Sequence, residues 1–268
     1  MIAWHQQLLN SIAIHYTEYN TIISPFPIIK VEDKPLLIHL ISIDQNLHKI
    51  SPNHFSKISE QAAAQNLKCI HLWEDNWFQH PVLISNRLKA LMNQSQKIHG
   101  RETITKRIDK QIATVFLQAN HLQQWANAYY KFGLYNKKNE LLAVATFSKS
   151  RVMIDGVIPY RSYELIRFAS KSGITVVGGL SKLLSFFINQ YQPAHLMTYA
   201  DRDWSLGESY QKIGFKNVGY KMDETYWVHP NQLIRNKAKP LTEQEYAQKG
   251  FLPIYTSGSI KYVLDRRT

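Results

Sequence analysis

Residues 163–220 bring together the side chains of this sequence that are best suited to chemistry. An apolar run at 165–169, a turn with paired glycines, an apolar helical stretch and a second apolar run at 195–199 follow one another there. This order predicts a strand, a helix and a parallel strand, and such units bind ligands at the carboxyl ends of their strands. The residues placed to meet a ligand are Arg167, Gly178, Gly179, Ser181, Lys182, Asp201, Arg202 and Tyr210.

Some of these residues also have a purely structural interpretation. Arg167 lies in an otherwise apolar strand, where an unpaired guanidinium is costly, and Asp201 or Glu164 would be its partner. Ser181 could simply cap the helix that follows the glycines. Tyr210 could pack beneath the sheet. Both interpretations stay open for each residue at this point.

The composition is that of a folded protein with room for two domains. The chain has 268 residues, of which 44% are hydrophobic and 19% charged, and that balance is typical of globular proteins. The single cysteine, Cys69, excludes an internal disulfide framework and fits the reducing cytoplasm. No apolar run is long enough to span a bilayer. We therefore expect a cytoplasmic protein without a membrane partner.

Positive charge is unevenly distributed along the sequence. The formal net charge is +12, and residues 1–80 contain only five Lys or Arg beside seven Asp or Glu. Residues 81–268 hold the other 27 basic and 13 acidic residues. Such an excess favours a polyanionic partner, most simply nucleic acid, with Lys149, Arg151 and Arg202 as contacts. The alternative is a basic protein without such a partner.

The pattern of apolar residues and turn residues predicts the elements that must position these side chains. In the first part we expect a helix within 1–20, strands at 21–31, 35–43 and 70–73, and helices at 51–67 and 80–92. A polar linker is predicted at 93–103. The second part starts with a strand at 104–108, a helix capped by Asp109 and a hairpin at 129–135 and 141–147. The predicted domains are residues 1–95, 104–230 and a C-terminal extension, 231–268, whose hairpin (253–255 and 260–264) packs on the second domain.

The segment at 67–93, LKCIHLWEDNWFQHPVLISNRLKALMN, resembles the last strand and helix of Vsr-like domains, which have the restriction-endonuclease fold. The resemblance implies a small α/β domain. Active members hold a divalent metal between carboxylates of neighbouring strands, whereas His39 stands where one carboxylate belongs. We therefore expect a degenerate nuclease-like domain without a metal. The alternative is a nuclease that uses Asp33, His39 and Asp44.

The segment at 208–220, ESYQKIGFKNVGY, resembles the Tyr-x-Lys-x-Gly-Phe ending of GNAT-type N-acyltransferases. Residues 179–181 stand where that family has its Gly-x-Gly/Ala turn, and the order of elements over 104–228 agrees with the family. The resemblance implies a GNAT-like α+β domain with a mixed central sheet. It also implies that Tyr210 protonates a departing thiolate, and that an acyl-CoA or related acyl donor lies across Gly178, Gly179, Ser181 and Lys182.

The order Arg167, Ser181, Asp201 and Tyr210 is similar to that in phage Mom-type proteins, GNAT relatives that modify adenine in DNA. Residues 60–265 resemble phage and mobile-element proteins that fuse a nuclease-like domain to a GNAT-like one. The leading hypothesis is a transferase that acylates a base amine of DNA or another nucleic acid. In it Asp201 orients or deprotonates the acceptor and Arg167 holds negative charge. The alternatives are a non-catalytic DNA-binding accessory protein and a metal-dependent endonuclease.

Overall fold

The computed structural model describes residues 2–222, 225–237 and 242–267, and the chain forms two compact units. The first unit consists of Met1–Ile84, Ala200–Gly207 and Gly219–Ile260, and the second of Ser85–Tyr199, Glu208–Val218 and Lys261–Thr268. Each unit is thus assembled from three segments, whereas the sequence suggested three consecutive domains. No helix within the described ranges is long and apolar enough to cross a bilayer.

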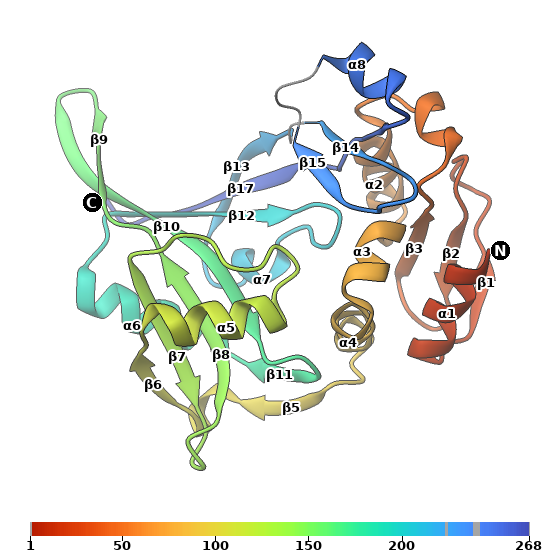
Figure 1. Cartoon of the computed structure of the whole chain (residues 1–268). Coiled ribbons are helices and arrows are strands. Elements are labelled where there is room, and N and C mark those ends of the chain that lie inside the picture. The colour runs from red at the N-terminus through yellow and green to blue at the C-terminus, as the bar shows by residue number, and fades with distance from the viewer. Residues whose placement is uncertain (1, 223–224, 238–241, 268) are drawn as a thin grey trace. The chain divides into compact units, whose positions relative to one another are not determined.

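The first unit is built on a sheet in the order β1-β2-β3-β4, in which β3 and β4 are parallel and the other pairs antiparallel (Figure 1). Every residue of β3 is buried, as expected for a strand covered on both faces. A smaller sheet has the order β15-β14-β16. The elements of this unit are α1 (Ala3–Ile12), β1 (Tyr16–Glu18), β2 (Ile28–Val31), β3 (Leu36–Ile41), η1 (Gln45–Lys49), α2 (His54–Ala64), β4 (Lys68–Trp73), α3 (Glu74–Gln79), β14 (Tyr226–Val228), β15 (Arg235–Lys237), α8 (Glu243–Gln248) and β16 (Leu252–Ile254).

The second unit is built on a mixed sheet in the order β13-β17-β12-β10-β8-β7-β6, with β9 paired to β10. The strands β10 and β12 are parallel, and β6, β7, β8 and β10 are successively antiparallel. The predicted mixed central sheet is confirmed. The elements of the second unit are β5 (Gln96–His99), η2 (Gly100–Glu102), β6 (Ile104–Arg107), α5 (Lys110–Asn120), β7 (Tyr130–Tyr135), β8 (Leu141–Phe147), β9 (Arg151–Asp155), β10 (Ile158–Ser170), β11 (Ile174–Val177), α6 (Gly179–Tyr191), β12 (His195–Asp201), α7 (Glu208–Gln211), β13 (Lys216–Lys221) and β17 (Ser259–Asp265).

Helix α4 (Pro81–Leu91) begins in the first unit and ends in the second. The last residues of β12 and β13 and the first of β17 also belong to the first unit. Most predicted elements are confirmed, including the 129–147 hairpin and the helix capped by Asp109, whose carboxylate accepts a hydrogen bond from the Ile112 N–H at 2.8 Å.

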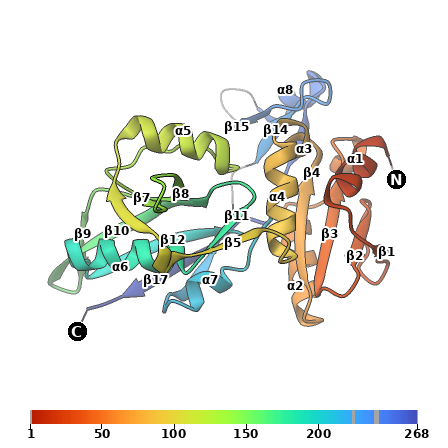
Figure 2. The same ribbon diagram turned by 90° about the horizontal axis from the view of Figure 1, so that it is seen from below.

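Helices α5 and α6 of the second unit cover opposite faces of its sheet (Figure 2). On one face, α5 packs Ala113, Phe116 and Leu117 against Val144 and Ala169. On the other face, the ring of Phe187 in α6 stacks on Phe147 of β8 with centroids 3.9 Å apart. Both faces of β8 are therefore buried, which fits its nearly continuous apolar sequence.

Two predictions about connecting segments are wrong. The range 93–103 is not a linker, because Gln96–His99 pair in parallel with Ile174–Val177 as β5 and β11. The two last strands do not form a hairpin with each other. Instead, β16 pairs with β14, while β17 lies between β12 and β13 in the other sheet. A short segment at 255–258 therefore connects two sheets rather than turning within one.

A chain of buried polar side chains crosses the core of the first unit. His39 and His71 are fully buried, and their Nδ1 atoms lie 3.0 Å apart, so one ring donates to the other. The Nε2 atom of each ring forms a hydrogen bond with a serine hydroxyl. Ser24 Oγ lies 2.9 Å from His39 Nε2, and Ser59 Oγ lies 2.8 Å from His71 Nε2. Burial and the neighbouring histidine charges lower the pKa of His39, and burial lowers that of His71 to about 3. Both rings are neutral in the folded protein.

Acid should therefore destabilise the first unit through this pair. The pKa of each ring in the folded protein lies below the usual 6.5. The free energy of unfolding should therefore be independent of these rings above about pH 6.5. Below that pH it should fall by up to about 1.4 kcal/mol per pH unit for each ring, because the unfolded chain binds the proton more readily. His39→Asn should remove one ring's share of this slope in urea unfolding followed by tryptophan fluorescence. His15→Asn, at an exposed position, is the control. An unchanged slope in His39→Asn would contradict the assignment.

Candidate functional site

The two central parallel strands of the second unit stay paired over only a short distance. In β10, Ser162, Tyr163 and Glu164 lie opposite residues 195–197 of β12, and the register between these strands ends there. A β-bulge between Leu165 and Arg167 follows in β10. Thr198 of β12 bridges the end of the pairing, because its hydroxyl donates to the Leu165 carbonyl at 2.9 Å. The strands therefore part towards their carboxyl ends, the position at which such sheets bind ligands.

The phenol of Tyr210 lies at this point. It forms a hydrogen bond with the Thr198 side chain, and its ring lies 5.7 Å from Tyr262 and 5.8 Å from Phe215 between centroids. Burial raises the pKa of Tyr210 above its usual 10.0. The phenol therefore keeps its proton through the neutral range and is chemically a proton donor.

The charges of two arginines act on this phenol and on a histidine, and we call the group of Tyr210, Thr198, Arg167, Arg87 and His121 the Tyr210 site. The charges of Arg87 and Arg167 act on both Tyr210 and His121, and the pKa of His121 is lowered to about 3 by burial and by these arginines. Positive charge without a protonated histidine creates a local potential that favours a developing anion.

The guanidinium of Arg167 is oriented by main-chain carbonyls rather than by a carboxylate. Its Nε donates to the Gln124 carbonyl at 3.2 Å and its Nη1 to the Ile166 carbonyl at 2.9 Å. Burial lowers the pKa of Arg167, and the charges of Glu164 and Tyr210 oppose this. Of the two partners expected for Arg167, Glu164 is thus the one whose charge acts on it.

The glycine turn before α6 is sterically tight. Gly178 is the N-cap of the helix with a φ of 73°, in the left-handed region. A Cβ on Gly179 would lie 2.9 Å from Val176 Cγ1, and a Cβ on Gly100 would lie 3.1 Å from the Val177 carbonyl oxygen. The segment β5–η2 thus packs directly against this turn and fixes its conformation. The first N–H groups of a helix such as α6 point out of its end and attract anions.

Ser181 and Lys182, the two predicted donor-binding residues that follow the glycines, differ in accessibility. Ser181 is exposed in the first turn of α6 and is not its cap, because that position is Gly178. Lys182 is bound to the protein itself: its Nζ donates to the Gly100 carbonyl at 2.9 Å and also to the Thr103 carbonyl. Lys182 therefore holds η2 in place.

Asp201 and Arg202 belong to the first unit, whereas Arg167 and Tyr210 belong to the second. The Asp201 carboxylate accepts a hydrogen bond from the Asp203 N–H at 3.0 Å, and its carbonyl accepts from Ser205 at 2.9 Å, so it closes the turn after β12. The Arg202 side chain is only 5% exposed, pairs with Glu60 at 3.2 Å and lies over the Tyr220 ring. Its charge is directed into the first unit rather than towards a polyanion.

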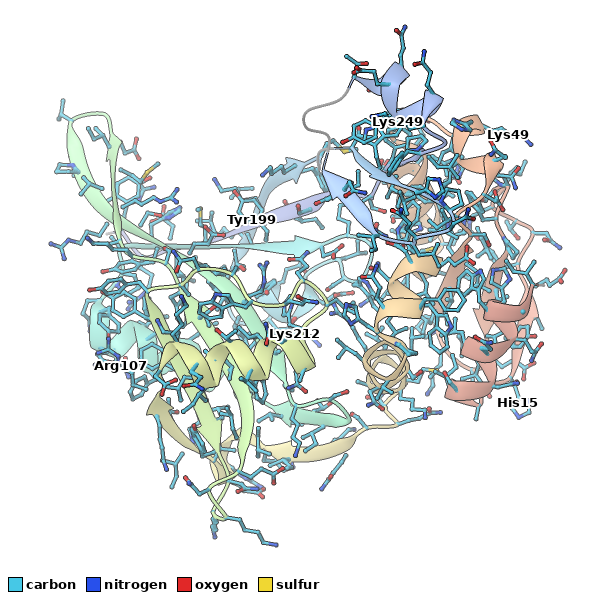
Figure 3. The ribbon with its side chains drawn as sticks, viewed as in Figure 1. His15, Lys49, Arg107, Tyr199, Lys212 and Lys249 are labelled. Atoms are coloured by element: carbon cyan, nitrogen blue, oxygen red, sulfur yellow. The ribbon has the colours of Figure 1, made fainter. Side chains whose placement is uncertain are left out.

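Lys149 and Arg151 are exposed, as a nucleic-acid contact requires. Arg151 begins β9, and Lys149 lies in the segment between β8 and β9. Lys212, labelled in Figure 3, follows α7 and is exposed as well. These residues give the second unit basic side chains on its surface that are open to solvent.

The three residues of the alternative nuclease site have separate local roles in the first unit. Asp33 lies in the turn between β2 and β3 with a φ of 57°, and Asp44 accepts the Asn46 N–H at 2.8 Å as the cap of η1. His39 is used by His71 and Ser24. In the part of the chain that the structure describes, no group of three or more His, Cys, Asp or Glu side chains could hold a metal ion.

Comparison with known proteins gives a limited result. No family model matches the chain, and no curated protein matches its sequence. Similar solved structures include the spermidine/spermine N-acetyltransferase of Vibrio cholerae (9% identity, 62% of this chain and 93% of that chain, TM-score 0.39). Others are the ribosomal-protein-S18-alanine N-acetyltransferase of Escherichia coli (15%, 62% and 95%, 0.38) and a Bacillus subtilis acetyltransferase in complex with CoA (13%, 61% and 98%, 0.37). TM-scores below 0.5 do not establish a common fold, so a relation to acetyltransferases is part of the proposal below.

Sequence reasoning missed three members of the Tyr210 site. Arg87 lies on α4 and Thr198 on β12, and neither has a motif around it. His121 follows α5 immediately, and the charges of Arg87 and Arg167 act on it. The one usable signal was the odd hydroxyl of Thr198 in a buried strand, because a buried hydroxyl needs a partner.

The glycine turn can be tested with a matched pair of substitutions. Gly179→Ala should cost about 1–3 kcal/mol of unfolding free energy, because the new Cβ overpacks against a stiff valine. Gly178→Ala should cost about 1–2 kcal/mol through backbone strain alone, since nothing lies within 4 Å of its Cβ position. In a Val176→Ala background only the cost of Gly179→Ala should shrink. Equal costs in both backgrounds, measured by urea unfolding, would contradict the steric explanation.

Proposed function

We propose that the second unit is an N-acyltransferase that uses an acyl-CoA or related thioester donor. The observation that supports this best is the place of Tyr210: a protonated phenol held by Thr198 where β10 and β12 part, beside two arginines. A transferase of this class needs one proton donor for a departing thiolate and positive potential for the developing charge. Both are present in one group of side chains.

The glycine turn before α6 is the proposed site for the donor's diphosphate. Gly178 and Gly179 carry no side chains, and the exposed Ser181 hydroxyl lies in the same turn. Backbone N–H groups and the helix dipole favour an anion there. The contacts of Lys182 with η2 make the turn rigid before any ligand arrives.

In the transfer step an acceptor amine attacks the thioester carbonyl and the carbon–sulfur bond breaks. The phenol of Tyr210 gives its proton to the departing sulfur, and the amine loses one proton to solvent or base, so charge balances. Arg167 and Arg87 stabilise the negative charge that develops on oxygen and sulfur. Because its pKa is lowered to about 3, His121 is neutral near pH 7. It therefore adds no further charge and can accept a hydrogen bond.

The proposed acceptor is a base amine of nucleic acid, as in the Mom-type proteins that the order of residues resembles. The support is the excess of positive charge after residue 80 and the exposure of Lys149 and Arg151. Arg202 has no part in this proposal, since it is buried. A second candidate, a non-catalytic DNA-binding accessory protein, is favoured by the same basic residues without requiring the Tyr210 site.

Tyr210→Phe tests the transfer chemistry. Loss of the acid should lower kcat by about 10²-fold or more with little change in KM for the donor, because the phenol acts on the leaving group. Its raised pKa keeps the acid protonated below about pH 10, so the alkaline loss of activity should lie above that pH. Tyr129→Phe, at a half-exposed tyrosine of the same unit, is the control.

The readout is mass spectrometry of nucleosides from DNA incubated with the protein and an acyl-CoA. Equal modification by wild type and Tyr210→Phe would rule out the acid role. DNA binding with no modified nucleoside would favour the accessory protein.

Binding to DNA is tested separately through Lys149. If its ammonium contacts phosphate, Lys149→Ala should weaken binding and make the slope of log K against log salt about 0.9 less steep. Lys57→Ala, at an exposed lysine of the first unit, is the matched control. A slope that Lys149→Ala leaves unchanged would remove this residue from the interface.

A further inference from the structure

The second unit carries a β-hairpin that projects beyond the rest of its sheet (Figure 1). It consists of β9 and the first five residues of β10, in which Arg151 lies opposite Ser162 and Asp155 lies opposite Ile158. We call residues 151–162 the arm. Every residue of β9 is exposed, including Val152 at 69% and Ile154 at 71%, and Val157 at the tip is 94% exposed. Apolar side chains are thus exposed on both faces of the arm, which is a marked liability for a soluble domain.

The backbone of β9 also has a free hydrogen-bonding edge. Within the described residues β9 pairs with β10 alone. Pro159 has no N–H, so its pair with Ile154 must be a non-hydrogen-bonded one. By alternation, the N–H and C=O groups of Val152 and Ile154 point away from β10. The β9 strand lacks the proline, lysine or bulge that usually protects an edge.

We propose that β9 pairs antiparallel with β9 of a second copy of this chain, around a two-fold axis at Met153. In this register Val152 of each copy lies opposite Ile154 of the other, so the outward backbone groups of these residues form four hydrogen bonds. The same register sets Arg151 of each copy opposite Asp155 of the second copy. A strand with the sequence RVMID is therefore complementary to itself in shape, polarity and charge.

The charges on the arm distinguish a second copy from other occupants. Asp155 is bound to Arg267 at 2.8 Å, but its side chain remains 70% exposed and can accept a further cation. A nucleic acid or an anionic lipid surface would attract Arg151 and repel Asp155, whereas self-pairing satisfies both. On the other edge of the arm, Pro159 removes one of the donors that a partner strand would need. The dimer thus forms through β9 and is independent of the proposed acyl transfer.

A cysteine crosslink tests the register. In a non-hydrogen-bonded antiparallel pair the Cα atoms are about 4.5 Å apart, within the range that a disulfide requires. Met153→Cys should therefore form an intermolecular disulfide under mild oxidation. The matched control is Val152→Cys, which would face Ile154 of the second copy and should crosslink at least about tenfold more slowly. The native Cys69 is buried and does not interfere. Equal rates for the two variants would overturn the register.

A charge exchange tests the pairing itself in the full-length protein. By sedimentation velocity, wild type should show a concentration-dependent monomer–dimer equilibrium. Arg151→Asp and Asp155→Arg should each raise the dissociation constant by more than about tenfold, since like charges then face each other. An equimolar mixture of the two variants restores both opposite-charge pairs and should dimerise like wild type. Val157→Lys adds charge at the tip outside the ladder and should leave the constant unchanged.

Several results would overturn the proposal. Wild type that stays monomeric at all concentrations would do so, as would a mixture that dimerises no better than its components. Changes in DNA or anionic-vesicle binding on arm substitution, without any dimer, would assign the arm to those partners instead. Should Asp155→Arg fail to fold, Arg151→Asp combined with Met153→Cys decides: a crosslinking rate equal to that of Met153→Cys alone would contradict the charge pairing.

Discussion

The short parallel pairing between β10 and β12 is the constraint on which the candidate site depends. Parallel strands in a continuous sheet would satisfy one another's backbone groups along their whole length. Here the pairing ends after Glu164, and the bulge before Arg167 turns the β10 backbone. The Leu165 carbonyl accepts its hydrogen bond from the Thr198 hydroxyl instead. One buried hydroxyl therefore both donates its hydrogen at the end of the ladder and keeps its lone pairs for the Tyr210 phenol.

The same departure explains why Arg167 can occupy a strand in a mostly apolar sheet. Its guanidinium finds carbonyls that regular pairing would not supply, one of them in its own bulge at Ile166. An arginine held by neutral carbonyls keeps its full positive charge, whereas an arginine in an ion pair would be neutralised. The positive potential beside Tyr210 is thus a consequence of backbone geometry. The opposite case is the buried salt bridge of Arg235 and Asp75 in the first unit, with Nε and Oδ2 2.6 Å apart. There the carboxylate neutralises the charge of the guanidinium.

Local patterns predicted the elements well and the connections poorly. Asp109 before an apolar helical stretch, and the turn between the strands predicted at 129–135 and 141–147, each specify local structure by chemistry within a few residues. The pairing of β5 with β11 joins residues 78 positions apart (Gln96 with Ile174), and nothing in the polar segment 93–103 indicates it. The 253–264 segment looks like a hairpin because its turn chemistry is correct. However, a Cβ on Gly258 would lie 2.4 Å from the Lys221 carbonyl oxygen, and the two strands join different sheets. Of the site, Tyr210 and the glycine turn were visible in a motif, while Arg87, Thr198 and the neutral state of His121 depend on tertiary packing.

Formal charge in a sequence is a poor map of surface charge, and this chain shows why. Arg202 and Lys182 count fully in the net charge of +12, yet one is buried over Tyr220 and the other donates to carbonyls of η2. Arg151 is exposed, but in the proposed dimer it faces Asp155 of the second copy. A polyanion and a second copy would then compete for the same guanidinium, whereas Lys149 lies outside the ladder and stays available in both states. If both proposals hold, dimerisation through β9 and binding of nucleic acid at Arg151 would be linked, and each would weaken the other.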